Sequence, residues 1–180
     1  MQMEGRYARY EWERRFLLRS FPSGANIHRI RKITDRYIAG TTLRLRRQID
    51  DEGGIVFKLT QKTPTARSGA LQGMITTIYL KECEFDVFAA LAAAVLTKTR
   101  YSVPPFGIDV FGGSLSGLVL AEAEFTSGDE ASALTVPSFV VHEVSSDQRF
   151  DGGCLATASR RQVETWVAEH GLALDATQFL

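Results

Sequence analysis

Charged and apolar side chains alternate with a period of two near the N-terminus of the chain. In residues 10–18, Glu11, Glu13 and Arg15 fall on one face of a strand, opposite the aromatic and aliphatic residues at positions 10, 12, 16 and 18. A buried sheet normally turns its apolar side inward, so a second, regularly charged side indicates a wet interior suited to ions. The pattern therefore predicts a β-strand that lines such an interior.

The same alternation recurs in four later segments, 41–48, 55–62, 96–103 and 118–125. Their charged faces carry, in chain order, Arg44 and Arg46, Lys58 and Lys62, Lys98 and Arg100, and Glu122 and Glu124. Alternating charges of this kind also occur on the solvent face of ordinary sheets. Because the cation pairs and the glutamate pairs lie on different strands, we favour a closed sheet with a charged lumen and with helices packed outside it.

Glycine-rich turns and two helical segments complete the predicted architecture. Residues 50–54 and 111–114 have the composition of hairpin loops, which indicates antiparallel strands. Residues 84–96 have the composition of a helix, apolar residues recur at helical spacing over 153–170, and 127–130 and 135–137 have loop composition. We expect a single α+β domain, mostly β, over residues 1–180. Its C-terminal helix, from about residue 153, would cover the barrel or plug one end of it.

The composition is that of a soluble, one-domain protein. The chain has 180 residues, of which 44% are hydrophobic, enough for one well-buried core. Its longest apolar run, residues 87–96, is much shorter than the roughly 20 residues of a membrane-spanning helix. Charged residues interrupt the N-terminus where a signal peptide needs an apolar core. Cys83 and Cys154 are too isolated for a disulfide framework or a zinc site, and we expect a cytoplasmic protein.

The net charge of zero conceals a strong asymmetry along the chain. Residues 1–62 carry 14 Lys and Arg against 7 Asp and Glu, whereas residues 101–180 carry 3 against 11. In a single closed domain these basic and acidic halves must face each other. The asymmetry is therefore consistent with a lumen that combines carboxylates with cations.

Taken together, the charged pairs and their neighbours resemble a CYTH domain, the triphosphate tunnel metalloenzyme family. The resemblance runs in order from about Tyr10 to Leu155 and is strongest from Lys98 through Phe125. The residues that carry it are Glu11-x-Glu13-x-Arg15, Tyr37-Ile38 before Gly40, Arg44-x-Arg46, Lys58, Lys98-x-Arg100, Ile108-Asp109-Val110-Phe111 with Gly113, Gly117-Leu118, Glu122-x-Glu124 and Glu143-Val144.

The resemblance implies an eight-stranded antiparallel β-barrel, a tunnel in which a triphosphate is bound with Mg²⁺ or Mn²⁺ and hydrolysed. The phosphate-binding residues implied are Arg15, Arg44, Arg46, Lys58, Lys98 and Arg100. The metal-binding residues implied are Glu11, Glu13, Glu122 and Glu124, with Asp109 and Glu143 at further acidic positions of the family pattern. Glu11, Glu13 and Arg15 would be catalytic. The chemistry is consistent, since guanidinium groups bind phosphate oxygens in pairs and Mg²⁺ prefers oxygen ligands.

Two departures from the family pattern affect this assignment. Arg15 stands where the family commonly has lysine, which keeps the charge and changes the geometry. In the strand predicted at 73–80, Thr76 and Thr77 stand where many members have a pair of glutamates. Neutral hydroxyls are poor replacements for carboxylates around a hard cation. Whether one metal ion or two would bind is therefore open.

Three functions are compatible with the pattern. The first is a metal-dependent hydrolase of inorganic triphosphate or a related triphosphate compound. The second is an adenylate cyclase acting on ATP, and the third is a non-hydrolytic binder of triphosphate or polyphosphate. In each case we expect a small-molecule ligand and neither a nucleic acid nor a membrane as partner. The sequence does not distinguish the individual substrates or the oligomeric state.

Overall fold

The computed structural model describes residues 7–68 and 70–174, except for the side chains of 64–68; the ends of the predicted domain lie outside these ranges. The strands are β1 (Arg9–Leu18), β2 (Arg29–Ile38), β3 (Leu43–Asp50), β4 (Ile55–Ser68), β5 (Leu71–Leu80), β6 (Ala93–Val103), β7 (Phe106–Phe111), β8 (Val119–Phe125) and β9 (Val140–Glu143). The helices are α1 (Glu82–Ala89), α2 (Gly128–Ala133), α3 (Gly152–Thr157) and α4 (Arg160–Ala168), with 3₁₀ turns η1 (Gly113–Leu115) and η2 (Gln148–Phe150).

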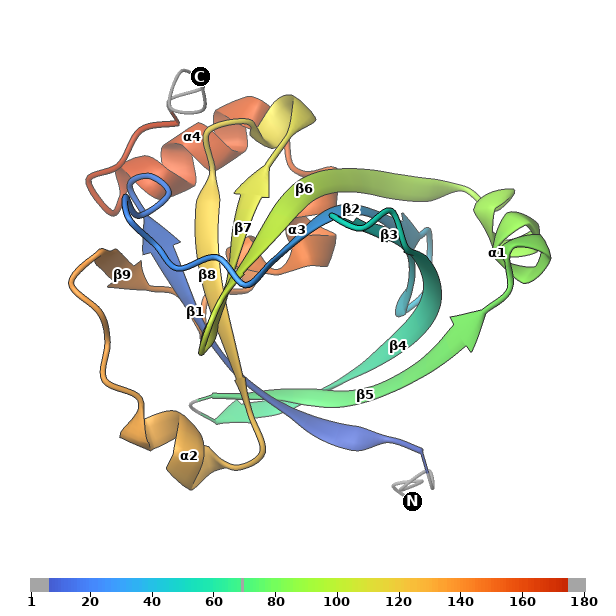
Figure 1. Ribbon diagram of the computed structural model, residues 1–180, viewed down its shortest axis with the longest axis horizontal. Helices are drawn as coiled ribbons and strands as arrows, with labels where there is room; N and C mark the ends of the chain where they lie inside the picture. The colour runs from blue at the N-terminus through green and yellow to red at the C-terminus, as the bar shows by residue number, and fades with distance from the viewer. Residues whose placement is uncertain (1–6, 69, 175–180) are drawn as a thin grey trace.

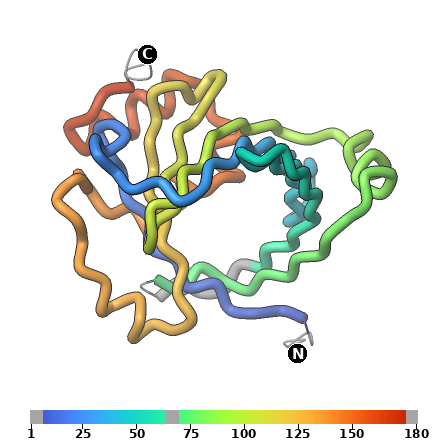
Figure 2. The backbone as a smooth tube through the Cα atoms, viewed as in Figure 1, coloured from blue at the N-terminus to red at the C-terminus, as the bar shows by residue number. Residues whose placement is uncertain are grey.

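Eight of the strands close into a barrel. The order of neighbours is β5-β4-β3-β2-β6-β7-β8-β1, and β1 pairs in turn with β5, so that the sheet has no free edge around the ring. The pairings between neighbouring strands are antiparallel. Figures 1 and 2 show the backbone following this ring. The predicted eight-stranded antiparallel barrel with flanking helices is confirmed.

Strand β1 changes partners along its length. Its first half, Arg9–Trp12, pairs with β5 and closes the barrel, whereas Trp12–Leu18 pairs with β8. We call the point where β1 changes partners the seam. Beyond it, Phe16–Leu18 also pairs with β9, on the edge of β1 opposite β8, and β9 extends the sheet outside the ring. The side-chain amide of Gln72 bridges the divergence by donating to the carbonyl oxygens of Glu13 and Ser145 at 3.3 and 3.1 Å. The seam is therefore held by hydrogen bonds although the ladder ends there.

Two apolar clusters cover the outside of the barrel. One lies over β1, β7 and β8 and includes Phe16, Ile108 and Ala121, with the segment after α2 packed onto it. The other lies over β2, β3 and β4, where Ile38 and Leu45 pack against α1. These residues occupy the apolar phase of the alternation seen in the sequence. Their burial outside the ring leaves the charged phase to face inward.

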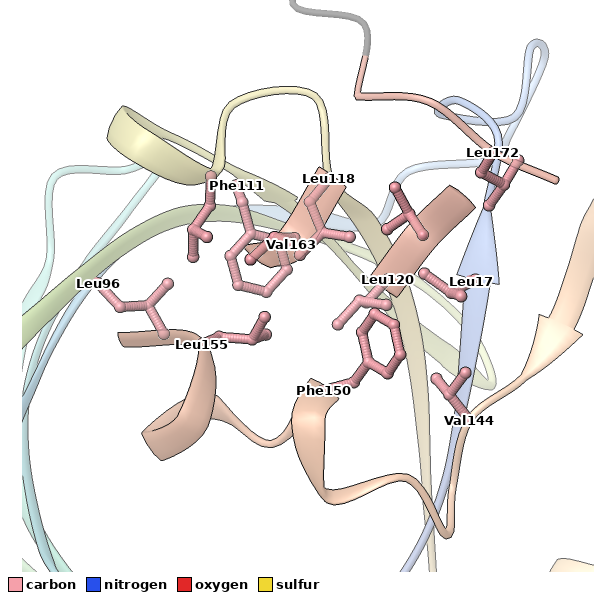
Figure 3. Close-up of a cluster of buried hydrophobic side chains, with 12 residues drawn as sticks. Leu17, Leu96, Phe111, Leu118, Leu120, Val144, Phe150, Leu155, Val163 and Leu172 are labelled. Carbon is pink, nitrogen blue, oxygen red and sulfur yellow. The ribbon is translucent and has the colours of Figure 1, made fainter. Parts of the chain in front are cut away.

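A third cluster fills one end of the barrel interior, and Figure 3 shows its side chains. Leu17, Leu96, Phe111 and Leu120 lie on the same strand faces as the charged residues, each two positions from one of them along its strand. They pack against buried residues of the C-terminal segment, which are Phe150, Leu155, Val163 and Val167. Each such side chain contributes about 1.5–3 kcal/mol when fully buried. Of the two roles considered for the C-terminal helix, the packing places it across one end of the barrel.

The predicted helix at 84–96 is partly wrong. Helix α1 ends at Ala89, and the alanine-rich stretch from Ala93 onward belongs to β6, where Ala93 and Ala94 pair with Ile38 and Tyr37. Alanine favours helix, but ladder hydrogen bonds to a neighbouring strand outweigh that preference. The described helices include none that is both long enough and apolar enough to cross a membrane.

Two other local predictions also need revision. Residues 127–130, predicted as loop, form the N-cap and first turn of helix α2, where the Ser127 hydroxyl accepts a hydrogen bond from the Glu130 N–H. The helical spacing over 153–170 corresponds to two helices, because Ser159 starts α4 with a capping box to Gln162. The hairpin loop at 50–54 is confirmed, with Gly53 at a φ of 85° between β3 and β4.

Candidate active site

The charged faces of the strands line one cavity inside the barrel, with a volume of about 720 Å³. We call it the tunnel cavity. It brings together both predicted glutamate pairs and the cations predicted to bind phosphate: Glu11, Glu13, Arg15, Arg44, Arg46, Lys58, Lys98, Arg100, Glu122 and Glu124. The residues singled out by the alternation and by the family resemblance therefore line this cavity.

The cavity has an acidic wall and a basic wall. The acidic wall is formed by the neighbouring strands β1 and β8, where Glu13 is paired in register with Glu124 and Arg15 with Glu122. The basic wall is formed by β2, β3, β4 and β6. On it Arg46 lies in register with Lys58. Two walls of opposite charge provide for a polyanion and for a cation bound beside it.

Arg15 joins the two glutamate-bearing strands. Its guanidinium donates to Glu13, to Glu122 at 3.3 Å and to Asp151 at 2.8 Å, and the side chain is almost fully buried. Burial and the neighbouring Glu122 carboxylate raise the pKa of Glu13 to about 7. Burial also acts to raise the pKa of Glu122, but Lys98 and Arg100 hold it well below its usual range. Arg15 thus binds two carboxyl groups that differ in pKa: Glu13 is the more readily protonated, and Glu122 is the less.

Asp109 lies on the inner face of β7, in register with Arg100, but is not among the residues that line the cavity. Its fully buried carboxylate accepts hydrogen bonds from Lys98 and, at 2.6 Å, from the Arg100 guanidinium. Arg100 also donates to Glu122. Its side chain passes over Gly107, where a Cβ would lie 3.2 Å from Arg100 Cδ. Asp109, a predicted metal ligand, therefore holds two predicted phosphate-binding cations in place in this structure.

Asp35, which the sequence patterns did not single out, binds Arg46 of the basic wall. The Asp35 carboxylate is fully buried and accepts two hydrogen bonds from Arg46, at 2.6 and 2.7 Å, with Arg44 Nε at 3.9 Å. Burial would raise its pKa, but the charge and hydrogen bonds of Arg46 lower it to about 2. The alternation of Arg29, Arg31 and Asp35 along 29–37 was a usable signal for this strand.

Lys62 is a further cation that the family pattern did not assign. It lies on the charged face of β4, and its ammonium group donates to both oxygens of Glu11, at 2.8 and 3.0 Å. The pair spans from β4 to β1 across β5 and lines the tunnel cavity. Glu11 is consequently held by a cation, as Glu13 and Glu122 are.

Of the two threonines of β5, Thr77 faces the inside of the barrel and Thr76 faces the outside. Thr77 lines the tunnel cavity, and its hydroxyl lies 3.0 Å from that of Thr60, whereas Thr76 is not part of the lining. The register runs from Arg44 to Thr60 to Thr77 across three strands. Since β5 has no acidic residue, it adds no carboxylate to the cavity.

Glu143 is not brought together with the other predicted residues. It lies on β9 outside the ring, where its carboxylate accepts two hydrogen bonds from Arg14 at 2.6 and 2.9 Å. It lines a different cavity, together with Trp12 and Ser145. The Arg14 hydrogen bonds lower its pKa. Glu143 lies outside the ring because its partner, Arg14, is on the outward face of β1.

The carboxylates of the tunnel cavity do not by themselves form a metal cage. Within residues 7–68 and 70–174, no group of three or more His, Cys, Asp or Glu side chains is arranged so that it could hold a metal ion. Instead, Glu11, Glu13 and Glu122 are paired with cations. A metal ion bound here would therefore take part of its ligands from elsewhere, such as the bound polyanion and water.

The chain thus forms a closed antiparallel barrel whose acidic and basic inner walls face each other across one cavity. No family model matches the chain. The chain is 34% identical over 156 residues to the inorganic triphosphatase of Nitrosomonas europaea, covering 81% of this chain and 96% of that protein. The chain belongs to the family of this inorganic triphosphatase.

Solved structures agree with this assignment. The crystal structure of the inorganic triphosphatase NE1496 matches with a TM-score of 0.54 at 29% identity, covering 82% of this chain and 95% of that one. A second structure of NE1496, described as a hypothetical protein, matches with a TM-score of 0.54 at 30% identity, covering 83% and 99%. The likeness thus extends over most of both chains.

Proposed function

We propose that this protein is a metal-dependent hydrolase that cleaves inorganic triphosphate, or a related triphosphate compound, inside the tunnel cavity. We further assign it to the triphosphate tunnel metalloenzymes, the CYTH family. The observation that carries the proposal is the pair of opposed charged walls around one cavity of about 720 Å³ in a relative of an inorganic triphosphatase. A triphosphate carries several negative charges, which the arginines and lysines of the basic wall would neutralise.

The residues present fit Mg²⁺ or Mn²⁺. Mg²⁺ is commonly held by one or two carboxylates together with substrate phosphates and waters, so a complete protein cage is unnecessary. Glu11, Glu13, Glu122 and Glu124 offer oxygen ligands on one wall of the cavity. Burial, followed by the Glu122 carboxylate, raises the pKa of Glu13, and a divalent cation bound beside Glu13 would favour its ionised form. A metal bound there would supply Lewis-acid activation of the phosphoryl group and of water.

The chain's own residues would bind and orient the substrate. Arg44, Arg46 and Lys58 on the basic wall would hold phosphate oxygens, and Lys98 and Arg100 would hold others from β6. Asp35 and Asp109 fix Arg46, Lys98 and Arg100 before the substrate arrives. Such preorganisation lowers the entropy cost of reaching the reactive geometry.

Entry of the substrate requires an exchange of partners near Arg15. Arg15 and Arg100 each bind more than one carboxylate, so each can release Glu122 to a bound cation and turn toward a phosphate oxygen. Glu13 and Glu122 on the acidic wall would then orient the attacking water. Positioning and charge neutralisation are the main demands of phosphoryl transfer, and this arrangement meets both.

The assay that tests the proposal measures phosphate release from inorganic triphosphate, ATP and thiamine triphosphate, with Mg²⁺, with Mn²⁺ and with a chelator. We expect orthophosphate from inorganic triphosphate only when a metal is present. Formation of a cyclic nucleotide from ATP would instead establish the cyclase. Tight triphosphate binding without turnover under all metal conditions would establish a binder and contradict the proposal.

A further inference from the structure

Asp151 reaches the active site from outside the strands of the barrel. It directly precedes helix α3 in the C-terminal segment, and its Oδ1 accepts a hydrogen bond of 2.8 Å from Nη1 of Arg15. The Arg15 side chain is 6% exposed and that of Asp151 is 29% exposed. Arg15 lines the tunnel cavity, whereas Asp151 is not among the lining residues. Asp151 thus contacts an active-site arginine without itself facing the space proposed for the substrate.

The contact replaces the usual role of an aspartate at this position. Asp151 is the N-cap residue of α3, where an aspartate normally accepts a hydrogen bond from a backbone N–H of the first turn. Its side chain makes no such hydrogen bond. Asp147, four residues earlier, holds the same position at η2 and does cap it, by accepting from the Arg149 N–H at 3.0 Å. The Asp151 carboxylate is therefore directed at Arg15 instead of at its own helix.

Each nitrogen of the Arg15 guanidinium has its own carboxylate. Nη2 donates to Glu13, Nε donates to Glu122 at 3.3 Å, and Nη1 donates to Asp151. Glu13 and Glu122 belong to the acidic wall, whose carboxylates the proposed function gives to a divalent cation. Because Asp151 does not line the cavity, it is the partner that Arg15 keeps after that exchange.

Cations of the basic wall are held in the same way. Asp35 binds Arg46 and Asp109 binds Arg100, and neither aspartate is among the residues that line the tunnel cavity. Both of these aspartates belong to strands of the barrel. Asp151 extends the arrangement to the acidic wall, and it does so from the C-terminal segment.

We propose that Asp151 is a positioning residue for the hydrolysis. It anchors Nη1 of Arg15, so that the remaining edge of the guanidinium, formed by Nε and Nη2, is held in place to donate to a phosphate oxygen. The inference rests on the proposed function, which supplies the substrate. A lysine has no second edge to anchor, because its ammonium group is a point charge. Without Asp151 the guanidinium follows Glu13 and Glu122, and a misplacement of about 1 Å can lower a rate by about 100-fold.

Asp151→Asn removes the charge with little change of shape. We expect kcat for triphosphate to fall about ten-fold or more while KM changes less than about two-fold, since orientation matters most in the transition state. The melting temperature should change little, because asparagine is an equally good N-cap residue. Asp147→Asn is the matched control from the same segment: it removes a pairing with Arg149 and should keep kcat within about two-fold of wild type. An unchanged kcat in Asp151→Asn, or an equal loss in both variants, would overturn the proposal.

Arg15→Lys shows whether Asp151 acts through Arg15. Lysine keeps the charge at position 15 but cannot use two edges. In the Arg15→Lys background, Asp151→Asn should lower kcat by less than about a further two-fold, because the group that it positions is already gone. Full, independent losses from the two substitutions would show that Asp151 does not act through Arg15.

The ¹⁵N NMR signal of the Arg15 Nε–H group reports its orientation without turnover, and its loss in Arg15→Lys identifies it. With a chelator present, we expect the Nε–H proton to exchange with water several-fold more slowly in wild type than in Asp151→Asn. Addition of triphosphate should shift the wild-type signal. Equal exchange rates in the two proteins would overturn the proposal. If wild type hydrolyses no triphosphate with Mg²⁺ or Mn²⁺, the proposed function fails, and the exchange rates still decide whether Asp151 orients Arg15.

Discussion

The inner face of the barrel changes character halfway along its strands. In β8, Leu120 packs against the C-terminal segment, whereas Glu122, two residues on, faces the tunnel cavity. In β1, Glu13 and Arg15 line the cavity, and Leu17 belongs to the apolar cluster. The two halves share strands, register and phase, yet one is filled with side chains and the other is open to water and ions. The difference shows that strand alternation determines which side chains face the inside of the barrel. Whether those side chains form apolar core or line a cavity depends on where the C-terminal segment packs against them.

The boundary between the two halves is formed by the start of the C-terminal segment that packs across one end of the barrel. Asp151 pairs with Arg15, and a Cβ at Gly152 would overlap the Tyr37 hydroxyl. Glycine is therefore required where the backbone of the C-terminal segment passes Tyr37. Four predictions probe the two halves and their boundary, beginning with the largest expected effect.

Glu122→Gln should affect the charged half strongly and the apolar half little. We expect kcat/KM for triphosphate to fall about 100-fold or more, because the neutral amide weakens a divalent cation's site while filling the same space. The melting temperature should change little, since Arg15 and Arg100 keep other carboxylate partners. Glu143→Gln is the matched control, because Glu143 lies outside the tunnel cavity, and it should retain activity. Equal losses in the two variants would contradict this placement.

Phe150→Ala should have the reverse effect. The Phe150 ring is 1% exposed in the apolar half and meets Trp166 edge to face. We expect the free energy of unfolding to fall by about 3–5 kcal/mol, measured by urea unfolding, because the truncation leaves a cavity. The kcat of the folded fraction should remain within about two-fold of wild type, since no substrate contact is removed. A large loss of kcat in the folded protein would show that the halves are not independent.

Asp35→Asn should change how stability depends on pH. The pKa of Asp35 is lowered to about 2, so its pairing with Arg46 contributes stability above its unfolded pKa, and that contribution is lost as pH falls toward the folded pKa. The stability advantage of wild type over Asp35→Asn should therefore shrink by roughly 2 kcal/mol on acidification from about pH 5. Urea unfolding over the acid range checks this. An advantage that is independent of pH would rule out the ion pair as its source.

Arg44→Ala should have the smallest effect of the four. Arg44 lines the tunnel cavity, where it makes a long hydrogen bond of 3.5 Å to the Thr60 hydroxyl and lies 3.9 Å from Asp35. We expect KM for triphosphate to rise about ten-fold with little change in kcat, as for a group that binds substrate and transition state equally. The neighbouring Arg47 is not part of the cavity lining, so Arg47→Ala serves as the control. An unchanged KM in Arg44→Ala would remove it from the phosphate site.

Much of the barrel could be predicted from the sequence because two-residue alternation is a local property. Once the faces of residues 10–18 and 118–125 were assigned, the inward position of Glu13 and Glu122 followed. The helix predicted at 84–96 was partly wrong because pairing with β2 is a long-range effect, absent from local composition. Asp35 was overlooked because the alternation of Arg29, Arg31 and Asp35 on one face of β2 is masked by Lys32 and Arg36 on the other face.

The position of Glu143 shows the limit of carrying a family pattern over by sequence alone. Spacing along the chain does not say on which side of β1 the added strand β9 lies, and here it lies outside the ring. The position of β9 depends on tertiary packing, which periodicity does not encode.

The most direct test of the central claim is a crystal structure with triphosphate and Mn²⁺, in which anomalous scattering locates the metal. Our account predicts the phosphates between the basic wall, at Arg46 and Lys98, and the acidic wall, with Mn²⁺ bound by phosphate oxygens and by Glu13 or Glu122. Triphosphate outside the tunnel cavity, or Mn²⁺ at Glu143 with none on the acidic wall, would contradict it.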